Sequence, residues 1–187
     1  MLLREESAAK GASRASVVLP HLLVHSLTPA TAQSSALAGR AQYIAAVACL
    51  KKALYLDPFA WIISYNLGLV HLHKSQFASA FHFFSSSINL KPDFSSAYMY
   101  LAITLANLDD FDNSCAAYEK ALSLDGADVV CRLNYAVTLL NSDELERSRE
   151  QIKELDKAIN GADDQHQPDD EVLQQIAELK IRIGRGR

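Results

Sequence analysis

Histidine side chains are the first candidates for chemistry in this chain. His71, His73 and His82 lie close together in the sequence, and clustered imidazoles are typical of zinc sites and general bases. His71 and His73 are two residues apart, so on a helix they point to different faces, and no cysteine or carboxylate stands at ligand spacing. His21 and His25 are four apart but lack the glutamate of a zinc-protease helix. We therefore interpret these histidines as packing or solvent-exposed residues and predict no metal site.

Other catalytic patterns are also incomplete. Asp110 and Asp112 suggest the start of a calcium loop, but Cys115 and Ala121 occupy the positions at which that loop needs glycine and glutamate. The sequence contains no nucleophile elbow and no glycine-rich phosphate loop. We predict that the protein is not an enzyme and uses no cofactor.

The cysteines and the charge balance narrow the class of protein. Cys49, Cys115 and Cys131 are odd in number and show no CxxC spacing, so we interpret them as reduced thiols of a cytoplasmic protein, with pairing or metal binding as the alternative. The net charge of −4 argues against a nucleic-acid partner, which requires a cationic face. No apolar run reaches the ~20 residues that a membrane helix needs, so we expect no membrane-spanning helix.

Residues 1–38 differ in character from the rest of the chain. Their longest apolar stretch, residues 17–27, is too short for a signal-peptide core and is interrupted by Pro20. Serine, alanine and arginine are frequent, as in mitochondrial transit peptides, but Glu5 and Glu6 are untypical of them. We predict a disordered or divergent leader over 1–38, with a transit peptide as the alternative.

The elements that would position any functional side chain follow from an internal repeat of 34 residues. Residues of the same chemical type recur at this spacing in several columns. These columns are Tyr43, Phe77 and Phe111; Ala46, Ala80 and Ser114; Leu50, Phe84 and Tyr118; Ala53, Ser87 and Ala121; Pro58, Pro92 and Gly126; and Gly68, Ala102 and Ala136. A fourth copy continues with Leu145, Ser148, Ile152 and Leu155. Such agreement predicts a stack of equivalent structural units.

Each unit is predicted to be two helices joined by a tight turn. The first helices cover about 61–74, 95–108 and 129–142, and the second helices about 41–57, 75–90, 109–124 and 143–158. Small residues allow two helix axes to approach closely, and a bulky side chain there would overpack the contact. The predicted small-residue contacts are Ala46, Gly68, Ala80, Ala102, Ser114 and Ala136.

This arrangement resembles the tetratricopeptide repeat, which implies an all-α solenoid of helical hairpins. We expect about three and a half units over 39–158, then a polar linker over 159–170 and a capping helix over 171–183. The first unit lacks a convincing first helix. Residues 27–40 either form a substitute helix or leave the array to begin with an unpaired second helix.

The first helices of such hairpins line a concave groove, which we expect to bind an extended segment or an amphipathic helix of a partner protein. The expected groove residues are Ile62, Tyr65, Asn66, Leu69 and His73 in one unit, Met99, Tyr100, Ile103 and Asn107 in the next, and Asn134 and Asn141 in the third. For Leu69, Ile103 and Val137, simple packing between helices is an equal alternative.

The chaperone-binding subclass of these repeats uses lysine and arginine on the first helices to hold a C-terminal carboxylate. Those places are occupied here by Ile62, Ser96, Tyr100 and Val130. We therefore do not expect a carboxylate clamp.

A narrower resemblance lies in residues beyond the general repeat pattern. The segments 65–72 (YNLGLVHL), 76–83 (QFASAFHF) and 133–137 (LNYAV) are similar to the Bardet-Biedl syndrome 4 family, the tetratricopeptide subunits of the BBSome. The similarity runs from about residue 39 to about residue 157. Members of that family carry many further repeats upstream.

The resemblance implies a non-enzymatic adaptor in ciliary membrane-protein trafficking and cilium assembly. It implies other BBSome subunits, centriolar-satellite components and dynactin components as partners, and contact with membranes only indirectly, through the complex. It also implies a cytoplasmic protein found at the cilium, the ciliary base and centriolar satellites. The alternative is a generic tetratricopeptide co-chaperone or assembly factor without a ciliary role.

Overall fold

Helices account for every regular element of the described chain. The computed structural model describes residues 32–160 and 168–185, with side chains placed for 43–160 and 168–184. Its helices are α2 (Ala32–Leu56), α3 (Trp61–His73), α4 (Phe77–Leu90), α5 (Ser95–Asn107), α6 (Phe111–Leu124), α7 (Val129–Asn141), α8 (Leu145–Asn160) and α9 (Asp170–Arg185). The all-α prediction is confirmed for these ranges. Most of the leader, with His21 and His25, and residues 161–167 of the predicted linker lie outside the described residues.

Three helical hairpins follow the 34-residue repeat: α3 with α4, α5 with α6, and α7 with α8. The first helix of each hairpin begins at the predicted residue, but the second begins two residues later than predicted. The cause is a left-handed residue in each turn: Ser75, Asp109 and Asp143 have φ values of 55°, 60° and 62°. A left-handed residue ends a right-handed helix and lets the next amide satisfy a free carbonyl.

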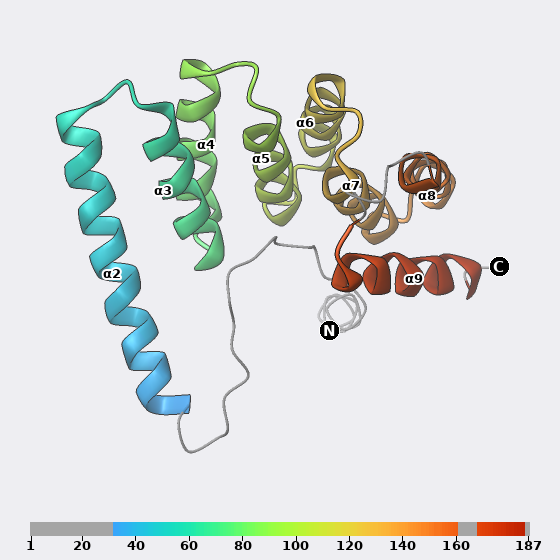
Figure 1. Ribbon diagram of the computed structural model, residues 1–187, viewed down its shortest axis with the longest axis horizontal. Helices are drawn as coiled ribbons and strands as arrows, with labels where there is room; N and C mark the ends of the chain where they lie inside the picture. The colour runs from blue at the N-terminus through green and yellow to red at the C-terminus, as the bar shows by residue number, and fades with distance from the viewer. Residues whose placement is uncertain (1–31, 161–167, 186–187) are drawn as a thin grey trace, which may run out of the picture. The chain divides into compact units, whose positions relative to one another are not determined.

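For the described part of the first unit, the structure decides between a substitute first helix and an unpaired second helix. Helix α2 runs without interruption through 25 residues, so residues 32–40 extend the second helix instead of forming an antiparallel partner for it. Figure 1 shows α2 as one long helix beside α3. Within the described residues, α2 therefore has no first helix of its own.

The chain divides into two compact units, and α2 to α6 form the described part of one of them. In this unit α3 packs against α2, α4 and α5, while α5 also packs against α4 and α6. Each first helix therefore lies between its own second helix and the second helix of the preceding repeat (Figure 1).

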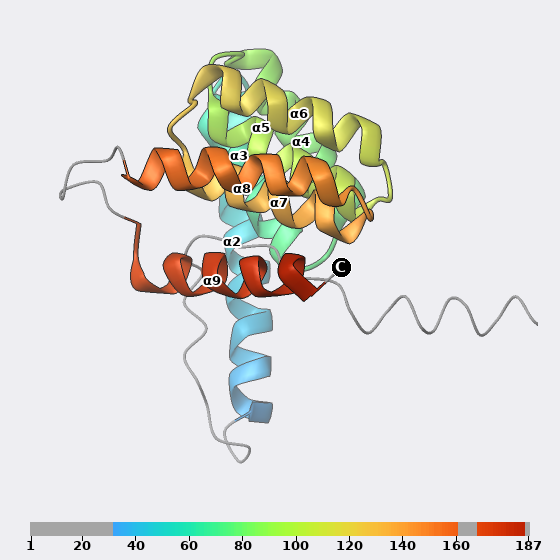
Figure 2. The same ribbon diagram turned by 90° about the vertical axis from the view of Figure 1, so that its right-hand side faces the viewer.

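Helices α7, α8 and α9 form the described part of the other unit. Figure 2 shows α9 lying alongside the α7–α8 hairpin. Their common core consists of Leu133, Ala136, Val137, Ile152, Leu155, Ile176, Leu179 and Ile183. Helix α9 begins one residue before the predicted capping helix and ends two residues after it, and its apolar stripe covers the last hairpin.

Small residues lie at the close contacts of the hairpins. Gly68 of α3 faces Phe84 of α4 so closely that an added Cβ atom would stand 2.6 Å from the ring. Ser114 donates a hydrogen bond of 2.8 Å to the carbonyl of Ala102, and Ser148 makes the same bond of 2.8 Å to Ala136. These bonds join the two helices of a hairpin, from a side chain of the second helix to the backbone of the first. Ala80, Ala102, Ser114 and Ala136 are fully buried, whereas Ala46 of α2 is only half-buried.

Candidate protein-binding groove

The accessible part of the predicted groove lies on α3 and at the end of α5. Ile62 is 41% exposed, and His73 and Asn107 are exposed as well. Tyr65, Asn66 and Leu69 are half-buried. The Asn107 amide donates 2.8 Å to the carbonyl of Ile103, so its side chain is held along its own helix.

Three predicted groove residues of α5 are buried instead of lining an open surface. Met99, Tyr100 and Ile103 are 3%, 6% and 1% exposed. The reason is the position of α5, which packs against α3, α4 and α6 at once. For Ile103 the packing alternative is the one that the structure shows. Tyr100 stacks on Phe84 at 5.8 Å between ring centroids, so it serves the core of the unit.

The two remaining groove residues belong to α7. Asn134 is fully buried, and its own carbonyl accepts a hydrogen bond of 2.9 Å from the hydroxyl of Thr138. Asn141, at the end of the helix, is half-buried. Asn134 therefore cannot contact a partner unless the hairpin opens.

An aromatic cluster at the start of α3 and α5 extends the groove beyond the residues predicted from the sequence. The Trp61 ring lies 4.6 Å from Phe94, and Tyr65 lies 5.0 Å from Phe94 and 5.8 Å from Tyr100. The Lys91 ammonium stands 4.8 Å from the Trp61 ring, a cation–π distance. Trp61 and Phe94 were absent from the predicted groove. The sequence could have indicated both residues, because each is an aromatic residue at the start of a predicted first helix.

Tyr65 combines an apolar ring with a polar tip at this cluster. Partial burial of the phenol raises the pKa of Tyr65 to about 12. The hydroxyl therefore stays protonated at neutral pH and remains a hydrogen-bond donor. A partner's backbone carbonyl is the kind of acceptor that such a donor fits.

The groove helices carry almost no charge. Neither α3 nor α5 contains Lys, Arg, Asp or Glu, and the histidines of these two helices are His71 and His73 of α3. This surface suits an apolar or uncharged segment. Neither of the two helices supplies a cation that would hold a carboxylate, and Lys91, next to Trp61, lies outside both of them.

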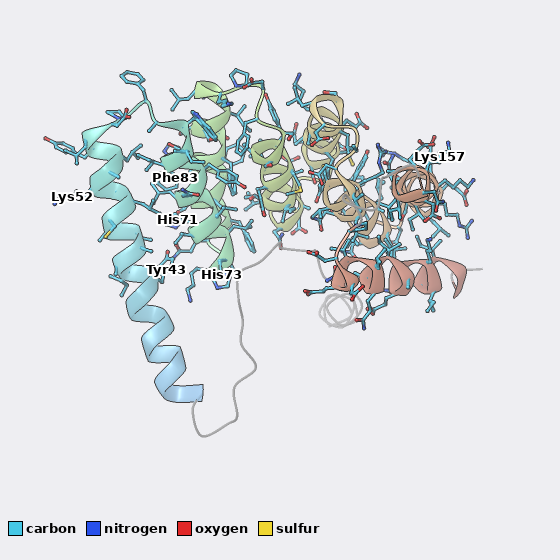
Figure 3. All side chains as sticks on the ribbon, in the orientation of Figure 1. Tyr43, Lys52, His71, His73, Phe83 and Lys157 are labelled. Carbon is cyan, nitrogen blue, oxygen red and sulfur yellow. The ribbon has the colours of Figure 1, made fainter. Side chains whose placement is uncertain are left out.

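His71 has a packing role at the junction of α2 and α3. Gln76 accepts hydrogen bonds at its Oε1 from Tyr43 Oη at 2.7 Å and from His71 Nδ1 at 2.6 Å. The imidazole also stacks on Phe83, with ring centroids 5.2 Å apart and planes 11° apart. Figure 3 shows Tyr43, His71 and Phe83 converging between these helices, with His73 farther along α3. His71 therefore links α2 to the first hairpin, while His73 is exposed.

Among the described residues, neither the side-chain clusters nor the helices indicate a metal site or a membrane span. No group of three His, Cys, Asp or Glu side chains converges in them as a metal site would require. None of their helices is both long enough and apolar enough to cross a membrane.

The sequence of this chain is similar to those of several known proteins. Residues 95–128 match the tetratricopeptide repeat. The chain is 48% identical over 122 residues to the BBSome complex member BBS4 of Mus musculus, a match covering 65% of this chain and 24% of the relative. The BBS4 homolog of Drosophila melanogaster is 34% identical over 116 residues, covering 59% of this chain and 24% of the relative. The chain thus spans about a quarter of the length of these relatives.

Solved structures share the fold at low sequence identity. MamA 41-end from Desulfovibrio magneticus RS-1 has a TM-score of 0.62 and 23% identity, covering 68% of this chain and 72% of that one. The TPR2B domain of yeast Sti1, solved as a pHsp70 complex, has a TM-score of 0.61 and 18% identity, covering 68% and 98%. The described residues therefore have the fold of tetratricopeptide-repeat solenoids, residues 95–128 match that repeat, and the sequence is similar to that of the BBSome complex member BBS4.

Proposed function

We propose that this chain is a non-enzymatic scaffold that binds other BBSome subunits and serves ciliary membrane-protein trafficking and cilium assembly. The observation that carries the proposal is the 48% identity to BBS4 over 122 residues. Localisation at the cilium, ciliary base and centriolar satellites belongs to the same proposal, as do centriolar-satellite and dynactin components as partners.

The proposed contact surface is the accessible groove of α3 and α5, comprising Ile62, Tyr65, Asn66, Leu69, His73 and Asn107. The neutral character of both helices supports an apolar partner segment, because burying such a segment against them leaves no charge unpaired. The aromatic rings of Trp61 and Phe94 add apolar area at one end of this surface. Met99, Tyr100 and Ile103 are buried in α5 and belong to the core of this unit, not to its accessible surface.

The test is affinity purification of the tagged chain from ciliated cells, followed by mass spectrometry. We expect other BBSome subunits to co-purify with the wild type. The variant Ile62→Glu should lose them, because a carboxylate would be buried in an apolar contact. Ile181→Glu on α9 is the matched control, since Ile181 is also exposed, at 56%.

Recovery of no BBSome subunit with the wild type would reject the ciliary proposal. Equal recovery with Ile62→Glu and the wild type would reject the groove as the contact surface while leaving the scaffold role standing. Circular dichroism of both variants verifies that they remain helical.

A further inference from the structure

The second helix of each later repeat has a face that its own first helix covers. The columns on this face are almost completely buried. They are Ala80, Phe84 and Ser87 in α4, Ser114, Tyr118 and Ala121 in α6, and Ser148, Ile152 and Leu155 in α8. The serine bonds to the carbonyls of Ala102 and Ala136 identify the covering helix as the first helix of the same hairpin.

A neighbouring column belongs to the same face. Phe83 of α4 stacks on His71 of its own first helix at 5.2 Å. In α8 the equivalent residue, Gln151, accepts a hydrogen bond of 3.4 Å from Arg132 of its own first helix. The equivalent residue of α2 is Cys49.

Helix α2 presents these columns without a covering helix in the described residues. Ala46, Leu50 and Ala53 are half-exposed, and Cys49 is exposed. Lys52 and Leu56 flank them, and Leu56 is 73% exposed. Figure 3 shows Lys52 on the side of α2 that faces away from α3. We call Ala46, Cys49, Leu50, Lys52, Ala53 and Leu56 the uncovered α2 face.

We propose that the uncovered α2 face binds a helix of a partner protein, in the position that the first helix holds in the later hairpins. That helix carries a small residue at its closest approach and an acidic residue one turn before it. The site is separate from the groove on α3 and α5, so it adds a second contact to the proposed scaffold.

The small residue follows from the geometry of the equivalent contacts. In the later hairpins Gly68, Ala102 and Ala136 stand opposite this face, and the helix backbones are close enough for a serine hydroxyl to reach a carbonyl at 2.8 Å. Ala46, Cys49 and Ala53 are themselves small, so α2 allows the same approach.

The acidic residue follows from charge complementarity. Arg132 stands one turn before Ala136 and reaches toward Gln151, the counterpart of Cys49. The counterpart of Lys52 is Glu154, whose pKa is lowered first by the hydrogen bond and charge of Lys157 and further by the charge of Arg132. In this hairpin the basic Arg132 of the first helix thus faces the acidic Glu154 of the second helix. In α2 the sign is reversed, because Lys51 and Lys52 are its C-terminal charges and α2 contains no acid.

A partner helix fits this face better than two other occupants. A second copy of α2 would bring its lysines against those of the first, and like charges repel. The segment ahead of α2 carries Pro20 within its apolar stretch, and proline disrupts a helix interior.

Two synthetic peptides from this chain provide the probe. Both span residues 127–143, the first helix of the last hairpin, with Cys131→Ser to remove the thiol. One also carries Arg132→Glu, and the other keeps Arg132. With fluorescein-labelled peptides and the purified full chain, anisotropy should show at least about tenfold tighter binding of the glutamate peptide, the effect of roughly one well-placed charge pair.

Charge reversal in the protein locates the contact. Lys52→Glu should invert the preference, so that the arginine peptide binds more tightly. Lys120→Glu is the matched control: Lys120 is exposed at the same repeat position of α6, where α5 already covers the face. Cys49→Trp should abolish binding of both peptides by filling the contact, and its far-ultraviolet circular dichroism should match the wild type because Cys49 is exposed.

Several outcomes would overturn the proposal. These are failure of both peptides to bind, equal binding of the two, and a preference unchanged by Lys52→Glu. A dimer in sedimentation that Cys49→Trp abolishes would assign the face to a second copy. Resistance of Cys49 to maleimide in the monomeric full chain would assign it to a segment of the chain itself. None of these results depends on BBSome subunits, so failure here leaves the ciliary proposal to its own test.

Discussion

At the scale of single residues, Gly68 shows why one position of the repeat must hold a small residue. The ring of Phe84 lies where a Cβ atom would project, at 2.6 to 2.9 Å from three ring atoms. Phe84 is fully buried, so the ring has no free direction in which to move. A glycine in a helix interior costs about 1 kcal/mol relative to alanine, and this contact offsets that cost by allowing the hairpin to close.

The substitution Gly68→Ala is expected to lower the free energy of unfolding despite its better helix propensity. Overpacking a filled core costs about 1–3 kcal/mol, which exceeds the propensity gain. Gly184→Ala is the matched control, because nothing lies within 4 Å of a Cβ atom at that position of α9. Urea denaturation measures both. A stability of Gly68→Ala equal to or above the wild type would mean that the ring can shift.

Tyr65 predicts a pH dependence at the alkaline end. Its folded-state pKa is raised to about 12 by burial, against an ordinary value of 10.0, so the unfolded chain loses the proton first. The stability that Tyr65 contributes is complete below pH 10 and is lost as the pH rises toward 12. In Tyr65→Phe this part of the loss should be missing, as urea unfolding at pH 8 and pH 11 would show. An identical decline in both proteins would assign the loss to other groups.

At the scale of elements, the turns within the hairpins repeat as faithfully as the helices. Ser75, Asp109 and Asp143 adopt the left-handed conformation at the same repeat position, although none of them is glycine. Gln76, Asp110 and Glu144 then donate their amides to carbonyls five residues back, at 2.9 to 3.0 Å. These bonds satisfy helix-end carbonyls and compensate for the strained residue before them.

Helix α9 covers the apolar side of the α7–α8 hairpin through a few large residues. Leu179→Ala should lower the free energy of unfolding by about 2–4 kcal/mol, because a buried leucine leaves a cavity. The adjacent Lys180→Ala removes an ion pair of 2.6 Å to Asp156 at the surface and should cost less than about 1 kcal/mol. Chemical denaturation of the two variants separates the contributions. Similar losses for both would indicate that α9 is held by charge instead of apolar burial.

At the scale of the whole molecule, the absence of charged residues from α3 and α5 predicts that these helices do not hold a carboxylate as chaperone-binding repeats do. The clamp positions on these helices hold Ile62, Ser96 and Tyr100, none of which pairs with an anion. Specific capture of a peptide typically has a Kd of about 1 μM. Titration with an acidic C-terminal chaperone peptide should therefore show no saturable binding up to a peptide concentration of ~100 μM. Micromolar binding would revive the co-chaperone alternative and weaken the case for a neutral groove.

The sequence by itself determined the hairpins, because small and large residues recurring every 34 positions permit only one way for paired helices to approach. It also located the C-terminal ends of α4 and α6, since Pro92 and Gly126, which follow them, act locally on the backbone.

Only the tertiary structure decided which side chains of α5 and α7 remain accessible. Met99, Ile103 and Asn134 occupy the same repeat positions as partly open residues of α3, but neighbouring helices cover them. It also decided that α2 continues as one helix through the place of a first helix. Both outcomes depend on contacts between segments far apart in the sequence, which no local pattern of residue types records.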